Sequence, residues 1–159
     1  MDIEDATFYW TINSSNSTEE SASNFRIKPD PHLILRGRWQ VALSHIYFSS
    51  GGFVDQKTMP SEVFVMSTIC VPSLVGPSQR LPLLRVIPVQ RSKGEDSGVN
   101  GLQGMSGVFD LRPQYHNIRV AQITSLDISV TDNELKPVQC SPNSSISLTL
   151  HFMKLKNQN

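Results

Sequence analysis

The sequence predicts an all-β domain, a sandwich or a barrel built from about eight strands. Segments in which apolar and polar residues alternate recur between stretches rich in Ser, Asn, Pro and Gly, a pattern typical of short strands joined by turns. No segment of a dozen residues carries the 3.6-residue apolar period of a helix. The hydrophobic fraction of 38% and the charged fraction of 18% also suit a loop-rich β protein. A chain of 159 residues is expected to form one domain over residues 1–159.

The N-terminal quarter is expected to hold two strands separated by a loop. The segment "TFYWTI" at 7–12 is dense in aromatic and β-branched residues, which favour strands. The polar, low-complexity stretch over 13–23 is expected to be a flexible loop. A short strand "FRI" follows at 25–27, and "KPDPH" at 28–32 predicts a turn because its two prolines lack a backbone donor.

The segment "RGRWQVALSHIYF", residues 36–48, predicts the next strand and contains an irregularity. Its first half places alternate apolar residues on one face: Trp39, Val41 and Leu43. The alternation slips by one residue at Ser44 and His45, after which Ile46 and Phe48 take the apolar positions. A slip of one residue turns every later side chain to the opposite face. Either a β-bulge absorbs it or the strand bends and changes its packing partner.

Two middle strands carry features of interest for assembly. The segment "EVFVMSTICV" at 62–71 is apolar on both faces, so it is expected to lie between a second sheet and either a neighbouring subunit or a loop. The segment "LPLLRVIPV" at 81–89 carries two prolines, which predicts an edge strand or a strand broken at Pro88. An unpaired edge is a place where another chain could add.

The C-terminal half begins with a long loop and ends with the clearest strand. Residues 90–107 contain five of the nine glycines and no phosphate-binding motif, and a loop of this length is usually functional or disordered. "ITSLDISVTD" at 123–132 and "ISLTLHFMK" at 146–154 both alternate apolar and polar residues. The period-2 spacing predicts one core between two antiparallel sheets that includes these residues: Trp39, Val41, Leu43, Leu126, Ile128, Leu148, Leu150 and Phe152.

Charge and cysteine content restrict the function classes. Fourteen basic and fourteen acidic residues give a net charge of zero, which disfavours nucleic-acid binding through phosphates and favours self-association. Cys70 and Cys140 are expected to be small buried hydrophobes in a reducing compartment, although one disulfide between them stays open. The acidic N-terminus has no apolar leader, and no segment is long and apolar enough for a membrane span, so a protein that is not secreted is expected.

The sequence predicts no enzyme. None of the four histidines, His32, His45, His116 and His151, lies in an HxH or HExxH motif, and no GxSxG motif is present. No catalytic, cofactor-binding or metal-binding residue is therefore predicted, and no cofactor. His45 is expected to be a core or bulge histidine with a satisfied hydrogen bond, and His151 to face solvent or an interface. A structural protein or a binding module remains.

Four segments of the chain resemble, in the same order, signature segments of one protein family. They are "LRGRWQVALSHIYF", "PLLRVIPV", "FDLRPQYHNIRVAQITSLDISVTDNELKPV" and "SISLTLHFMK", which together span about Leu35 to Lys154. They are similar to segments of the penton-type minor capsid proteins of Polinton/Maverick elements, adintoviruses and related double-jelly-roll viruses. Two places depart from the family pattern: Glu134-Leu135 stands where a turn Gly is common, and Met153-Lys154 replaces the usual final Arg pattern.

The resemblance implies an eight-stranded single jelly-roll sandwich of two antiparallel four-stranded sheets. It also implies a structural role, in which five copies form the fivefold vertices of an icosahedral particle and contact a double-jelly-roll major capsid protein. The expected location is the virion capsid, with synthesis in the host cytoplasm or nucleus and no direct nucleic-acid binding. The Gly37 turn would set the approach to a core strand. The slip at Ser44-His45 would bend that strand where it leaves for the next sheet.

Two alternatives from other classes stay open. One is a β-sandwich binding module for a carbohydrate or a receptor, which would act as a monomer and show an aromatic-lined groove. The other is a jelly-roll enzyme, which would need a metal or a convergent acid–base pair.

Overall fold

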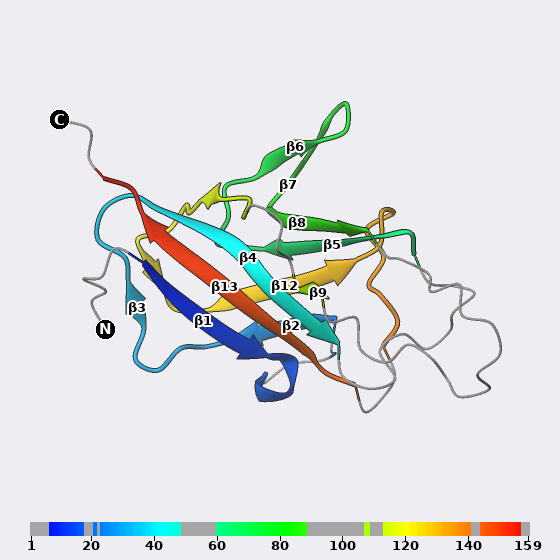
Figure 1. The fold of residues 1–159 in the computed structure, drawn as a ribbon, viewed down its shortest axis with the longest axis horizontal. Helices are drawn as coiled ribbons and strands as arrows, with labels where there is room; N and C mark the ends of the chain where they lie inside the picture. The colour runs from blue at the N-terminus through cyan, green and yellow to red at the C-terminus, as the bar shows by residue number, and fades with distance from the viewer. Residues whose placement is uncertain are drawn as a thin grey trace.

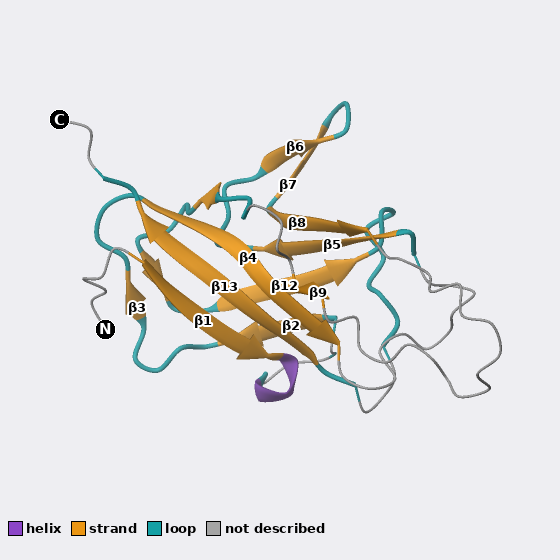
Figure 2. Cartoon of the chain, in the orientation of Figure 1, coloured by secondary structure: helices purple, strands orange, loops and turns teal. Residues whose placement is uncertain are grey.

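The chain folds into antiparallel β-sheets with a single 3-10 turn among its described residues (Figures 1 and 2). This computed structural model describes residues 7–17, 21, 23–48, 60–88, 107–108, 113–140 and 144–156. The strands, in chain order, are β1 Thr7–Asn13, β2 Asn24–Ile27, β3 Leu33–Ile34, β4 Trp39–Phe48, β5 Glu62–Ser67, β6 Ser73–Val75, β7 Gln79–Leu81, β8 Leu83–Pro88, β9 Gly107–Val108, β10 His116–Asn117, β11 Gln122–Ile123, β12 Leu126–Thr131 and β13 Ile146–Lys154.

Two main sheets lie one behind the other. The first has the order β1-β13-β4-β10, with β9 also paired to β4, and the second has the order β2-β12-β5-β8. Figure 1 shows β1, β13 and β4 in front of the second sheet, while the small β6-β7 ribbon projects from the body. All pairings between these strands are antiparallel. The predicted all-β class is confirmed, and the arrangement is that of a β-sandwich.

One hydrophobic core lies between the sheets and joins residues of both. Each of the eight predicted core residues belongs to this cluster, and each is at most 3% exposed: Trp39, Val41, Leu43, Leu126, Ile128, Leu148, Leu150 and Phe152. In β13 the alternation is complete, because Ile146, Leu148, Leu150 and Phe152 are all fully buried. The period-2 pattern therefore predicted the core correctly.

A β-bulge absorbs the slip in β4. Thr149 of β13 pairs with His45, whereas the next residue, Leu150, pairs with Leu43, so Ser44 is the extra residue. Beyond the bulge, β4 continues to pair with β13 as far as Phe48. The bulge alternative is confirmed. The implied departure to the other sheet at the slip is wrong, since one extra residue restores the inward face without changing the partner strand.

A glycine turn sets the approach to β4, as expected. Gly37 has a φ of +94°, a conformation that residues with a side chain rarely adopt. The turn is fixed on both sides, because the Trp39 indole donates to the Arg36 carbonyl at 3.1 Å and the Leu155 amide donates to the Arg38 carbonyl at 2.8 Å.

The two middle strands are shorter than predicted. The expected strand at 62–71 ends at Ser67, where the chain turns and the Cys70 amide donates to the Ser67 carbonyl. The expected strand at 81–89 is divided at Pro82, which separates β7 from β8 because proline cannot donate to a ladder. β8 lies at the edge of its sheet and ends at Pro88, so the edge position is confirmed.

Parts of the two predicted flexible loops lie outside the described residues. Within 13–23, Asn13 ends β1 and caps the 3-10 helix η1, Ser14–Asn16, by accepting from the Ser15 amide at 2.8 Å. Positions 18–20 and 22 lie outside the described residues, as does 90–106. The flexibility of both loops stays a prediction.

Candidate interaction surfaces

A row of aromatic side chains crosses the outer face of the first sheet. Tyr9 of β1 pairs with His151 of β13, which pairs with Ala42 of β4. Because His116 pairs with Val41, the preceding residue, Tyr115, lies opposite Ala42. Four neighbouring chain segments thus bring three ring-bearing side chains to one line, which we call the aromatic row: Tyr9, His151 and Tyr115.

The aromatic row is held together by direct contacts. The Tyr9 and His151 rings stack with centroids 4.4 Å apart and an angle of 22°. The Tyr115 hydroxyl lies 2.7 Å from His151 Nδ1, with the two rings edge to face. Ala42 lies beneath and is fully buried. We infer that this small side chain leaves the space through which Tyr115 reaches His151.

The row is uncharged at neutral pH. Burial lowers the pKa of His151 below its ordinary value of 6.5, so the imidazole is neutral at pH 7 and shares a hydrogen bond with the Tyr115 hydroxyl through Nδ1. Burial, together with the nearby Tyr9, raises the pKa of Tyr115. Tyr9 is 66% exposed, so the stacked pair presents a fixed aromatic ring to its surroundings.

The rest of this outer face is polar and also uncharged. Thr11 and Thr149 hydrogen bond at 3.1 Å, and Asn13 donates to Ser147 at 2.6 Å. No Asp, Glu, Lys or Arg stands at the outward positions of β1, β4 and β13, which are Thr7, Tyr9, Thr11, Asn13, Gln40, Ala42, Ser44, His45, Tyr47, Ser147, Thr149, His151 and Met153. Protein interfaces are likewise depleted of charge at their centre and enriched in tyrosine. We call this surface the uncharged face.

The second sheet carries a hollow of about 430 Å³ on its outer side. Its charged groups neutralise each other, because Arg26 of β2 and Asp127 of β12 form an ion pair at 2.5 Å. Its lining consists of Asn24, Phe25, Arg26, Met66, Ser67, Thr68, Pro82, Asp127, Ile128 and Ser129. Both main sheets therefore carry a neutral surface feature, a row on one and a hollow on the other.

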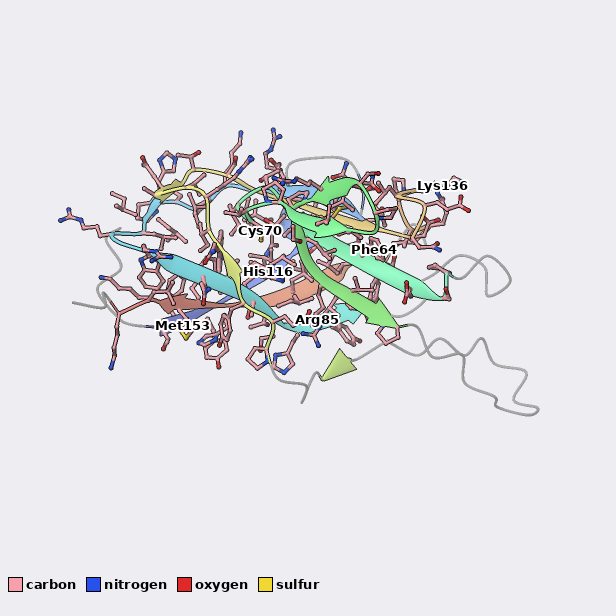
Figure 3. The ribbon with its side chains drawn as sticks, turned by 90° about the horizontal axis from the view of Figure 1, so that it is seen from above. Phe64, Cys70, Arg85, His116, Lys136 and Met153 are labelled. Carbon is pink, nitrogen blue, oxygen red and sulfur yellow. The ribbon has the colours of Figure 1, made fainter. Side chains whose placement is uncertain are left out.

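A buried arginine and a histidine meet at the side of the sandwich where β8 approaches β4. Arg85 of β8 is 8% exposed, and it pairs with Val65, whose side chain lies in the core. His116 of β10 comes from the other sheet and lies near enough for an electrostatic interaction with the Arg85 guanidinium (Figure 3). Burial lowers the pKa of His116, and the Arg85 charge lowers it further. A hydrogen bond with the Leu84 backbone acts in the opposite direction and raises this pKa. Burial and the Arg85 charge together thus favour the neutral form of the His116 imidazole.

The other histidines fall in separate places. His45 follows the bulge and is exposed, with its Nδ1 2.9 Å from the Ser44 hydroxyl, so the bulge interpretation is confirmed and the core one is wrong. His151 lies on the outer face, as expected, and His32 is exposed near Gln122. The described residues contain no group of three His, Cys, Asp or Glu side chains that could hold a metal ion. The absence of an enzymatic site and of a cofactor stays a prediction.

Both cysteines are free thiols. Cys70 is fully buried, and burial raises its pKa to about 12. Cys140 is half-buried, and burial raises its pKa as well. The expectation of unpaired, inward cysteines is confirmed for Cys70 and in part for Cys140. Among the residues that the structure describes, no helix has the length and hydropathy needed to cross a membrane.

Sequence reasoning did not find the aromatic row or the buried arginine. The available signals were a small residue, Ala42, at an outward strand position and a charged residue, Arg85, within an apolar strand. Neither signal identifies a partner without the register between strands. Comparison of the sequence with protein-family models and with curated proteins gave no match.

Proposed function

We propose that this protein is a structural minor capsid subunit, a single jelly roll that forms the fivefold vertices of an icosahedral particle. The observation that carries the proposal is a nested pairing of strands. Eight strands of the two main sheets form four nested pairs, in which the first strand pairs with the last, the second with the seventh, the third with the sixth and the fourth with the fifth: β1 with β13, β2 with β12, β4 with β10, and β5 with β8. Nested pairs of this kind support a rolled-up hairpin, which is the construction of a jelly roll.

The four segments that carry the family resemblance fall on the strands of this arrangement. They coincide with β4, with β8, with the stretch from β10 to β12, and with β13. The resemblance thus follows the framework of the sandwich, which supports a common architecture. Fold alone does not fix function, so the assignment to a vertex depends on the ordered segments.

The proposed partners follow from the same role. The subunit would meet four further copies of itself and a double-jelly-roll major capsid protein in the virion, after synthesis in the host cytoplasm or nucleus. The zero net charge and the uncharged face support self-association, because charge repulsion between copies is small. We further propose that the protein neither catalyses a reaction nor binds nucleic acid directly.

A monomeric binding module for a carbohydrate or a receptor is the second candidate. The observation that favours it is the exposed Tyr9 ring, since a fixed aromatic ring can stack on the apolar face of a sugar. Against it, the described lining of the hollow has one aromatic residue, Phe25, and the aromatic row lies on the opposite sheet. Small-ligand sites usually combine a hollow and several aromatic side chains in one place.

Native mass spectrometry separates the two candidates. The capsid proposal predicts an assembly of five chains of 17.7 kDa each, alone at high concentration or with the major capsid protein. The binding module predicts a monomer under both conditions, with glycan binding that Tyr9→Ala abolishes. Tyr47→Ala is the matched control, because Tyr47 is also exposed on the uncharged face but lies outside the aromatic row.

A further inference from the structure

We propose that the aromatic row of one subunit docks into the hollow of the next, with the Tyr9 ring as the inserted group. The proposed occupant is a second copy of this chain. The inference rests on the proposed function, because it describes the contact that would close the ring.

The positions of the two features suit a head-to-tail ring. Such a ring joins two different surfaces of each subunit, so every copy must carry both halves of the contact. The row lies on the outer face of the β1-β13-β4-β10 sheet, and the hollow lies on the outer face of the β2-β12-β5-β8 sheet. The outer faces of a two-layer sandwich point in opposite directions. Each subunit can therefore offer the row to one neighbour and the hollow to the other.

The shapes of the two features are complementary. Tyr9 is 66% exposed on an edge strand, and its stacking on His151 fixes the ring before contact, which reduces the entropy lost on binding. The hollow, of about 430 Å³, is larger than one tyrosine side chain. Its apolar lining residues, Met66 and Pro82 among them, can contact a phenol ring on insertion.

The charges of the two features are also compatible. The aromatic row is neutral, and the hollow holds an ion pair between Arg26 and Asp127. Insertion of Tyr9 would bury no uncompensated charge, which is the condition for a favourable interface. The Arg26 guanidinium, within its ion pair, also offers a cation to the ring face, and Ser129, another lining residue, offers a hydroxyl to the phenol.

A second copy explains the two features better than a free ligand does. A glycan on the Tyr9 ring would use the row and leave the hollow without a role. A small ligand in the hollow would leave the uncharged face without one. One contact between copies uses both.

Cysteine cross-linking tests the contact. Chains carrying Thr11→Cys, on the exposed face of β1 two residues from Tyr9, are mixed with chains carrying Ser129→Cys, so that the Tyr9 ring stays in place. The mixture is treated with a short bis-maleimide reagent, and the linked peptides are identified by mass spectrometry. Cross-linked pairs are expected in the mixture and not in either variant alone. The double variant is expected to give linked species up to five chains. Tyr47→Cys with Ser129→Cys is the matched control and should remain unlinked. Wild type accounts for any reaction of Cys70 and Cys140.

The outcomes distinguish this contact from the proposed function. A five-chain assembly without the Thr11–Ser129 link, or with the Tyr47–Ser129 link in its place, overturns the contact and leaves the capsid role standing. A protein that stays monomeric with and without the major capsid protein overturns both. Glycan binding by a monomer, lost in Tyr9→Ala, assigns the row to the binding module instead.

Discussion

Replacing Leu148 by Ala should cause a large loss of stability. Leu148 is fully buried in β13, between Ile12 of β1 and Ile46 of β4 in the register of the sheet. The substitution removes three carbon atoms, about 2.4 kcal/mol of transfer free energy at about 0.8 kcal/mol for each. The cavity left between the sheets adds to this, so the free energy of unfolding should fall by about 2–5 kcal/mol. The matched control is Thr149→Ala, one residue further along and on the outer face.

Urea denaturation at one fixed protein concentration measures both variants. Thr149 is half-buried and its hydrogen bond to Thr11 is exposed, so Thr149→Ala should lower the free energy of unfolding by less than about 1 kcal/mol. The m-value should be the same for both variants and wild type, because the surface exposed on unfolding is nearly unchanged. A loss below about 1 kcal/mol for Leu148→Ala, or equal losses for the two variants, would refute the assignment of the inner and outer faces of β13.

Three further predictions concern the backbone, the pH dependence and a thiol. Gly37→Ala should lower the free energy of unfolding by about 1 kcal/mol, because Gly37 has a φ of +94°, which alanine rarely adopts. Leu135→Gly is the control and should not lower it, because Leu135 already has a φ of +64°, which glycine adopts more readily than leucine. Equal losses for the two variants would contradict the turn geometry. The folded-state pKa values of His116 and His151 lie below 6.5, so the unfolded state binds more protons and stability should fall as the pH drops below about 6.5. Urea midpoints between pH 7.5 and 5 check this, and a stability that rises on acidification, or a slope unchanged in a His116→Asn and His151→Gln double variant, would contradict it. Cys70 should resist alkylation at pH 8 until the protein unfolds, and rapid labelling of the native protein, followed by mass spectrometry, would disprove its burial.

The sequence predicted those features that depend on local alternation. The bounds of β13 agree with the predicted segment at 146–154, because that segment is strictly apolar on one face and polar on the other. The bulge in β4 was visible as a slip of one residue at Ser44, since a bulge is the simplest way to keep both halves of a strand facing one core. The predicted core was correct for the same reason.

Features that depend on pairing between distant segments could not be predicted. Tyr115 reaches His151 only because β10 lies beside β4, and no local pattern marks a strand as short as His116–Asn117. The β6-β7 ribbon was also missed, because strands of three residues are too short for an alternation to be recognised. In the sequence, nothing distinguishes Arg85 from a charged residue at an exposed strand position. It is buried because it lies two residues from Ile87 on the inward face of β8, where it pairs with a core residue, Val65.

A reconstruction of icosahedral particles assembled from this chain and the double-jelly-roll major capsid protein tests the proposed function most directly. We predict density for five copies of the β-sandwich around each fivefold axis, with the two outer faces of every copy turned toward its neighbours. Fivefold vertices that lack this chain, or particles that assemble with the same vertices in its absence, would contradict the proposed role.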